Sequence, residues 1–195
     1  RAFAMLKPYA DSLITIADVC LCEYTSQGHC GIVAEEALSY QRRLNITETR
    51  KVLTKQALSY ARAGASVVAP SAMCDGLTRE IRETLDSTGF EDVPILAYSS
   101  KYASNLYGPF RDAGEGAPQG FDRSSYQMDF QNSHEYALEN NADVVEGADM
   151  LMVKPALSYL DVIHSLRETT TLPLVAYNVS GEFSAVKAAA ERGWL

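Results

Sequence analysis

The stretch that decides the fold runs from Gly147 to Ser180 and reads GADMLMVKPALSYLDVIHSLRETTTLPLVAYNVS. It contains two apolar runs, MLMV and LPLVAY, with an amphipathic helical pattern between them. Neither run alternates between polar and apolar residues, which is typical of strands buried on both faces of a parallel sheet. The stretch therefore predicts a strand, a crossover helix and a second parallel strand.

The same pattern recurs nearer the N-terminus. Three further apolar runs, SLITIADVCL, ASVVAPS and VPILAYSS, begin at Ser12, Ala65 and Val93, and helical patterns separate them. The longest helix is predicted to begin at Thr47 and to close at Gly64, a residue type that commonly terminates helices. Five strand–helix units without a Gly-x-Gly-x-x-Gly turn favour an α/β fold of the (β/α)8 TIM barrel type over a dinucleotide-binding sheet.

The length and the ends of the chain predict that this barrel is incomplete. A whole barrel usually takes about 250 residues, and this chain has 195. It begins with Arg1 inside a helix-like stretch and stops just after another helical pattern. We therefore expect residues 1–195 to form a single partial barrel domain, an internal fragment without the first strands and the last strand. Unpaired strand edges would leave such a fragment inactive and prone to associate.

Composition narrows the class of protein. The net charge is −8 and the isoelectric point is about 4.9, so nucleic-acid binding, which needs a basic face, is not expected. No apolar run approaches the roughly 20 residues that cross a bilayer, so no membrane partner is expected either. Four cysteines, three of them clustered, do not indicate a disulfide framework, and we predict a cytoplasmic protein.

Two predicted connections exceed the usual length of about two to six residues. One covers residues 20–45 and contains the clustered cysteines, and the other covers residues 102–132. Both follow predicted strands, so both would lie at the C-terminal rim, where barrel enzymes carry their chemistry. We interpret 20–45 as a metal-site loop and 102–132 as an active-site lid. The alternative is a surface excursion without function.

Two lysines stand at predicted strand ends. Lys154 ends the run DMLMVK, and Lys101 follows ILAYSS. Burial and a neighbouring cation both disfavour the charged form of a lysine, and a neutral lysine forms Schiff bases with carbonyl substrates. The pair predicts Schiff-base catalysis. The alternative for each is a rim lysine whose ammonium stays in water.

The cysteine cluster lies in DVCLCEYTSQGHC, which begins at Asp18. Three thiolates can hold a zinc ion and leave one of its four tetrahedral positions open, as catalytic zinc sites do. His29 directly precedes Cys30 in the sequence, so it would be awkward for both residues to bind the same ion. Cys74 is isolated from the cluster and is expected to be a packing residue. Three buried free thiols are the alternative. The cluster consists of Cys20, Cys22 and Cys30.

Polar side chains near the same rim suit carboxylate recognition. Arg111 and Arg123 lie in the second long loop, and guanidinium groups bind carboxylates through paired hydrogen bonds. Ser180 follows the last predicted strand and can donate a hydrogen bond to a second carboxylate. Solvated loop arginines are the alternative.

Six stretches together resemble the porphobilinogen synthase (δ-aminolevulinic acid dehydratase) family, in the family's order and over almost the whole chain. They are DVCLCEYTSQGHCGI, APSAMCDG, SSKYASNLYGPFRDA, SYQMD, EGADMLMVKPALSYLD and AYNVSGEF. The resemblance implies a lyase of tetrapyrrole (heme) biosynthesis that condenses two molecules of 5-aminolevulinate into porphobilinogen with loss of water. It also implies a homo-oligomer, an octamer in the family, once the chain is full length.

The resemblance also implies roles for single residues. Lys154 and Lys101 would each form a Schiff base with one substrate molecule, and Asp18 would lie beside a catalytic Zn²⁺ held by the three cysteines. A separate, activating Mg²⁺ is implied at Glu139. The substrate carboxylates would be bound by Arg111 and Arg123 on one molecule and by Ser180 on the other.

Two other functions remain open at this point. A class I aldolase-like barrel would use Lys154 alone and would not depend on a metal. A catalytically inactive barrel would bind zinc and serve as a scaffold.

Overall fold

Five parallel strands form the centre of the computed structural model, which describes residues 2–34 and 43–195. Each strand overlaps one of the predicted apolar runs, which confirms the strand predictions. Residues 35–42 of the predicted metal-site loop lie outside the described residues. The strands are β1 (Ile16–Val19), β2 (Val67–Pro70), β3 (Leu96–Lys101), β4 (Met150–Lys154) and β5 (Leu174–Ala176).

The strands neighbour one another in their sequence order. β1 pairs with β2, β3 with β4 and β4 with β5, all in parallel. A parallel bridge between Val68 and Ile95 joins β2 to β3. A singly wound order of this kind is that of a (β/α)8 barrel, because a doubly wound sheet reverses its strand order partway.

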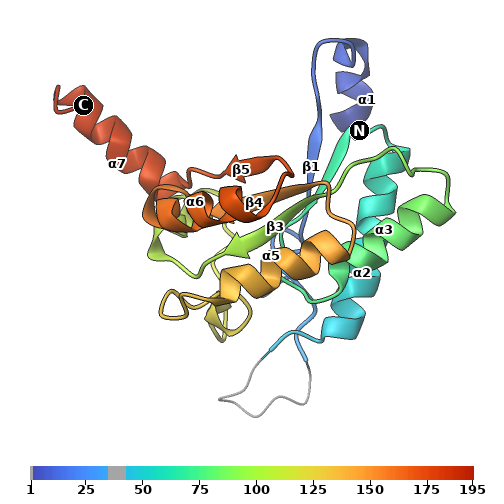
Figure 1. Ribbon diagram of the computed structural model, residues 1–195, viewed down its shortest axis with the longest axis horizontal. Helices are drawn as coiled ribbons and strands as arrows, with labels where there is room; N and C mark the ends of the chain where they lie inside the picture. Colours follow the sequence, from blue (N-terminus) through green and yellow to red (C-terminus); the bar gives the residue numbers. More distant parts are fainter. Residues whose placement is uncertain (1, 35–42) are drawn as a thin grey trace.

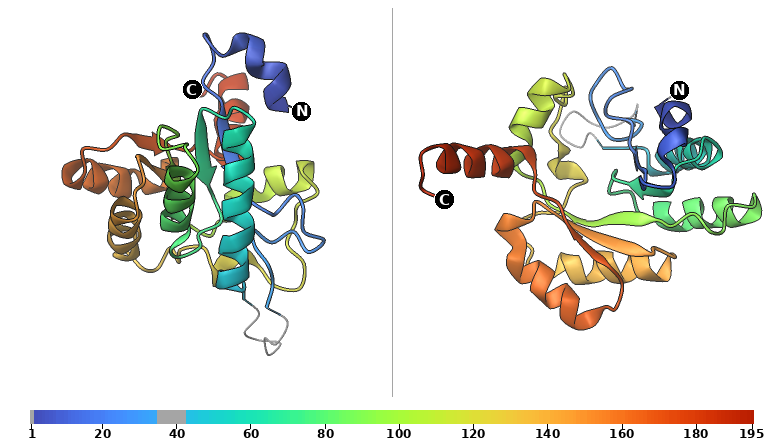
Figure 2. Two further views of the ribbon diagram at one scale, coloured as in Figure 1. Left: turned by 90° about the vertical axis from the view of Figure 1, so that its right-hand side faces the viewer. Right: turned by 90° about the horizontal axis from the view of Figure 1, so that it is seen from above.

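Helices connect successive strands, as Figures 1 and 2 show. α2 and α3 lie beside β1 and β2, and α5 and α6 lie together along the three-stranded part of the sheet, whereas α7 projects away from the rest. None of the described helices is both long enough and apolar enough to cross a membrane. The helices are α1 (Ala2–Leu6), α2 (Ile46–Arg62), α3 (Leu77–Ser87), α4 (Gly108–Ala113), α5 (Glu135–Val145), α6 (Leu160–Thr169) and α7 (Ser180–Glu191).

Two local features differ from the sequence predictions. α2 begins at Ile46 because the Asn45 side chain accepts a hydrogen bond from the Glu48 N–H (3.1 Å), so the N-cap lies two residues before the predicted start. The segment 102–132 is not wholly irregular, because α4 forms within it. Pro109 in the first turn of α4 has a backbone angle preset for a helix and needs no hydrogen-bond acceptor for its nitrogen.

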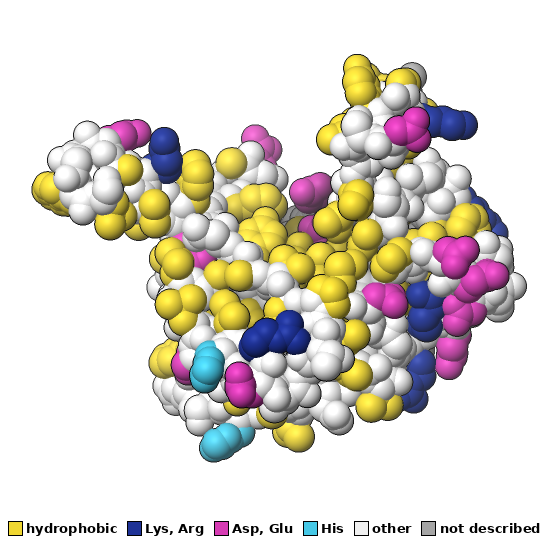
Figure 3. Space-filling model, turned by 45° about the horizontal axis from the view of Figure 1, so that its top comes forward, with side chains coloured by type: hydrophobic (Ala, Val, Ile, Leu, Met, Phe, Trp, Pro, Cys, Tyr) yellow, Lys and Arg dark blue, Asp and Glu magenta, His cyan; other side chains and the backbone are white. Residues whose placement is uncertain are grey.

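The main core lies where α2 and α3 pack against the first strands. Leu53 of α2 and Ile81 of α3 are completely buried there with Val68 of β2. Other large apolar side chains are exposed: Ile16 on β1 and Phe183 on α7 are each more than half exposed. Hydrophobic side chains gather in the hollow between the projecting α7 and the N-terminal helix (Figure 3). Among the described strands β1 does not pair with β5, so the sheet is open.

Leu53→Ala tests the position of this core. We expect the substitution to lower the free energy of unfolding by about 2–5 kcal/mol, because it removes a side chain with no exposed surface and leaves a cavity. Val52→Ala is the matched control on the next residue, which is 37% exposed, and should cost well under half as much. Urea unfolding measures both, and equal losses would contradict the described orientation of α2.

Candidate active site

The register of β3 and β4 brings the two predicted lysines together. Lys101 and Lys154 are paired residues in the parallel ladder, each the last residue of its strand. Residues paired in this way are neighbours on the same face of a sheet. Both lysines line one cavity of about 380 Å³ at the C-terminal strand ends, together with Asp18 and Ser180.

Lys154 lies in an aromatic enclosure. Its Nζ is 3.8 Å from the ring centroid of Tyr177, 5.3 Å from that of Tyr98 and 5.4 Å from that of Tyr107. Burial, followed by the positive charge of Lys101, lowers the pKa of Lys154 to about 8. The side chain is therefore available as a neutral amine near neutral pH.

Lys101 is more deeply buried than its partner, at 5% exposure. Its Nζ donates a hydrogen bond of 2.6 Å to the backbone carbonyl of Ser71, just after β2. Among the described residues no carboxylate forms a salt bridge with it. The chain therefore places two amines side by side with little ionic compensation.

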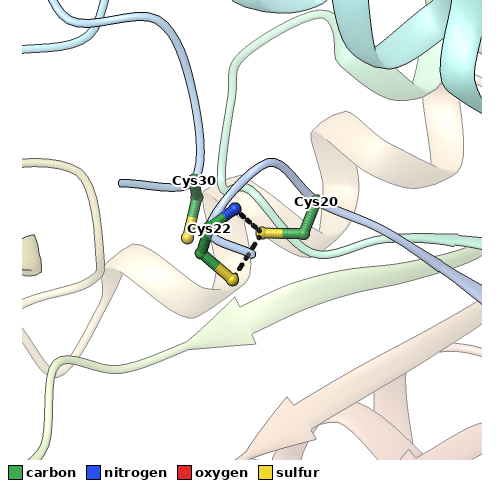
Figure 4. Close-up of side chains that lie close together, drawn as sticks. All are labelled: Cys20, Cys22 and Cys30. Carbon is green, nitrogen blue, oxygen red and sulfur yellow. Dashed lines mark hydrogen bonds between the residues drawn. The ribbon is translucent and has the colours of Figure 1, made fainter. Parts of the chain in front are cut away.

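The three predicted metal ligands converge at the edge of the same cavity. Their sulfur atoms all lie within 4.8 Å of one another, and the Sγ atoms of Cys20 and Cys22 are 3.3 Å apart. Figure 4 shows the side chains gathered around a common point. Hydrogen bonds from Cys20 and then Cys22 hold the pKa of Cys30 well below its usual value, and Lys101 acts in the same direction.

These donors fit a thiophilic divalent cation. A thiolate is the form of cysteine that binds metal, and before a metal arrives the hydrogen bonds among the three thiols favour a thiolate only at Cys30, whereas the pKa values of Cys20 and Cys22 are raised. Tetrahedral zinc with bonds of about 2.3 Å requires sulfur atoms about 3.8 Å apart. The sulfur atoms of Cys20 and Cys22 are 3.3 Å apart and all three lie within 4.8 Å of one another, so small shifts would reach that spacing. Among the described residues this is the one group of three or more close His, Cys, Asp or Glu ligand atoms.

Arg123 is buried and partly engaged. Its Nη2 donates hydrogen bonds of 2.8 Å to the backbone carbonyls of Gly28 and Gly116, while its buried Nε has no partner among the described residues. It lines the lysine cavity and also an adjoining cavity of about 410 Å³. Arg111, whose Nε likewise lacks a partner, lines only the second cavity.

Gln127 is a site residue that sequence reasoning missed. It is 5% exposed, lines both cavities, and neither of its side-chain amide atoms has a hydrogen-bond partner among the described residues. Buried amides are normally paired, so this one is free to bind a ligand. A usable signal was its position one turn after Arg123, within the quoted SYQMD stretch.

Ser180 lines the lysine cavity, whereas Glu139 does not. Ser180 begins α7, and its hydroxyl accepts a hydrogen bond from the Phe110 N–H (3.1 Å) and donates one to the Leu106 carbonyl (3.3 Å). Glu139 lies in a separate cavity of about 250 Å³. Burial, followed by the charge of Asp75, raises its pKa to about 7. The magnesium assignment to Glu139 stays a prediction.

The remaining polar residues differ in burial. Cys74 is buried, and burial raises its pKa to about 12, as suits a packing thiol. His134 and His164 are exposed on or beside helices. Asp18, on β1, is exposed toward the cavity that it lines.

Comparison with known proteins gives matches over the whole chain. A family model described as delta-aminolevulinic acid dehydratase matches residues 1–195. Curated proteins with that name are 55% identical in Synechococcus elongatus, 50% in Archaeoglobus fulgidus and 49% in Bacillus subtilis, each over all 195 residues. The chain spans 58–59% of the length of these relatives.

A solved structure supports the fold assignment. The delta-aminolevulinic acid dehydratase of Toxoplasma gondii, in complex with the reaction product porphobilinogen, matches with a TM-score of 0.94 and 50% identity. The match covers 100% of this chain and 55% of that one. This confirms the prediction of an α/β chain that forms part of a TIM barrel.

Lys101→Met tests the coupling between the lysines. Removing the positive charge of Lys101 should raise the pKa of Lys154 above about 8, because that charge disfavours the ammonium form. The pH dependence of Lys154 acylation, followed by peptide mass spectrometry, measures the pKa. Lys187→Met on exposed α7 is the control and should leave the profile unchanged. An unchanged Lys154 profile in Lys101→Met would contradict the described proximity.

Proposed function

The chain belongs to the delta-aminolevulinic acid dehydratase family, and from that membership we propose that its protein condenses two molecules of 5-aminolevulinate into porphobilinogen with loss of water. The observation that carries the proposal is the pairing of Lys101 with Lys154 in a cavity that is also lined by Cys20 and Cys22, two members of the cluster of three convergent thiols. Two amines suit two ketone substrates.

Lys154 is assigned the first Schiff base. At a pKa of about 8, about a tenth of the Lys154 side chains are neutral at pH 7, against about one part in 2,500 for an ordinary lysine. The neutral Nζ attacks the ketone carbon, and loss of water from the adduct leaves an imine. The tyrosine rings around Nζ exclude bulk water, which favours the imine over its hydrolysis.

Lys101 is assigned the second Schiff base, because its position in the register places a second ketone beside the first. Holding two reactants side by side removes much of the entropic cost of a bimolecular reaction. Deprotonation next to one imine gives the enamine that attacks the other molecule. We assign the acceptance of that proton to Asp18, a cavity carboxylate whose charge acts on Lys154.

The substrate carboxylates need separate anchors. Arg111, Arg123 and Gln127 offer unpartnered nitrogen atoms around the second cavity and are assigned to one carboxylate. Ser180 is assigned to the other, and its hydroxyl would exchange its present backbone partners for the substrate. Residues 102–132, which contain both arginines, act as the lid.

We propose Zn²⁺ as the cation held by Cys20, Cys22 and Cys30, where it would supply a Lewis acid that polarises a substrate oxygen.

The family resemblance also supports a cytoplasmic homo-oligomer, which would be an octamer when the chain is full length. Sedimentation of the full-length protein tests that assembly.

Lys154→Met in the full-length protein tests the reaction. With 5-aminolevulinate as substrate, we expect the wild type to form porphobilinogen and the variant to lose at least about a thousandfold in turnover, because no other amine has the position of Lys154. Colorimetric detection of the pyrrole measures the rate. Lys55→Met, on the exposed face of α2, is the control and should keep wild-type turnover.

Two results would refute parts of this assignment. Full turnover in Lys154→Met would exclude the proposed nucleophile. An aldolase-like enzyme would form no pyrrole, would use Lys154 alone and would be indifferent to Lys101→Met, whereas the proposed reaction should fail in both lysine variants.

Removal of the metal tests the second half of the proposal. Chelation should abolish pyrrole formation, and added Zn²⁺ should restore it. Cys30→Ala should lower the bound zinc per chain, measured by elemental analysis, because it removes the most readily ionised of the three ligands. Cys74→Ala, in a different cavity, should keep full zinc content. Undiminished turnover of zinc-free enzyme would overturn the role of the metal.

A further inference from the structure

The two long loops are joined by backbone contacts beside the metal ligands. The Gln119 N–H donates a hydrogen bond of 2.8 Å to the carbonyl of Gln27. The Arg123 side chain adds the bond to the Gly28 carbonyl already described. Segments 27–30 and 116–126, which we call the ligand segment and the lid segment, therefore contact each other along their length.

Gly28 permits this close approach. Its φ is +67°, and a Cβ built on it would lie 2.7 Å from the carbonyl oxygen of Ala117. Any larger residue would push the lid segment away. The close contact between the two segments therefore depends on glycine at position 28.

His29 fills the interface between the two segments. It has no exposed surface, and its ring stacks on Phe121 with a centroid separation of 3.8 Å. Nε2 lies 3.1 Å from the Gln119 carbonyl, which can only accept, so Nε2 carries the proton. Nδ1 then accepts from the Tyr126 hydroxyl at 3.1 Å. Both ring nitrogens are used, and neither is free to bind a metal.

The Tyr126 hydroxyl completes the connection. While it donates to His29, it accepts a hydrogen bond from the Cys30 N–H at 3.3 Å. One lid hydroxyl therefore contacts the backbone of a proposed zinc ligand. Tyr126 directly follows the short 3₁₀ helix Arg123–Ser125, so the same turn of chain carries Arg123.

We propose that Tyr126 and His29 are positioning residues that couple the lid segment to the metal site, an inference that rests on the proposed zinc site. A lid held by Tyr126 fixes the backbone of Cys30 and raises metal affinity. Because the two effects are thermodynamically linked, a bound metal must stabilise the held lid segment by the same free energy by which the held lid strengthens metal binding. The substrate anchors Arg123 and Gln127 lie on or beside this segment, so the metal also prepares the carboxylate site.

Tyr126→Phe in the full-length protein tests the coupling. Zinc affinity is measured by competition with a chromogenic chelator, and hydrogen–deuterium exchange follows the amides of residues 116–126 with and without zinc. We expect the variant to bind zinc at least about tenfold more weakly, the usual scale for loss of a group that orients a ligand. Zinc should protect the lid segment in the wild type and much less in the variant.

Tyr9→Phe is the control, because Tyr9 is 57% exposed and lies outside the site; it should behave as the wild type. Wild-type zinc affinity in a folded Tyr126→Phe protein would overturn the inference while leaving the proposed zinc site intact. If that variant does not fold, the exchange measurement on the wild type still tests the inference. Equal amide exchange of residues 116–126 with and without zinc would overturn the inference. A wild type that binds no zinc would instead refute the proposed metal site itself, and the inference with it.

Discussion

The site depends on the parallel register between β3 and β4. Because the last residue of each strand is a lysine and these two residues are paired, Lys101 and Lys154 have to share one end of the sheet and one face. A shift of one residue in either strand would turn one amine away from the cavity. The register itself shifts between Ala97 and Ser100, and this irregularity is what sets Lys101 opposite Lys154. A slip would disrupt the close packing of the completely buried Leu151 and the nearly buried Leu96 and Val153.

Burial and the charge of Lys101 lower the pKa of Lys154, and nearby acidic groups partly offset the positive charge of the pair. Burial and mutual repulsion disfavour two ammonium groups, which shows in the lowered pKa of Lys154. The adjacent thiols partly compensate, because Lys101 and Arg123 favour a thiolate at Cys30. The positive charge of Lys101 and a thiolate at Cys30 therefore stabilise each other. A metal bound by the cysteines would change both the ionisation of the thiols and the electrostatic effect of the thiols on the lysines.

Sequence alone was sufficient for the strands and for the placement of most chemistry-bearing residues. Continuous apolar runs identified the five strands, and parallel strand ends meet at one rim, so Lys101, Lys154 and the cysteines could be placed together. Their roles in catalysis stay predictions. Nothing in the residue pattern showed that Tyr98, Tyr107 and Tyr177, from three separate elements, surround one amine.

Other features were missed for similar physical reasons. The role of His29 depends on partners about 90 residues away in the sequence, and long-range contacts of this kind leave no local signal. The helix α4 was overlooked because its glycine and proline indicate a loop. Arg123 was assigned to substrate recognition, and its bonds to Gly28 and Gly116 show that it also supports the loops.

Both paired amines should capture ketones if they carry the proposed reaction. Borohydride reduction of the full-length protein in the presence of 5-aminolevulinate, followed by peptide mapping, would trap each Schiff base as a stable amine. We expect stable adducts on Lys154 and Lys101 and none on exposed lysines such as Lys55. Adducts distributed over surface lysines, or absent from both paired residues, would contradict the proposed reaction.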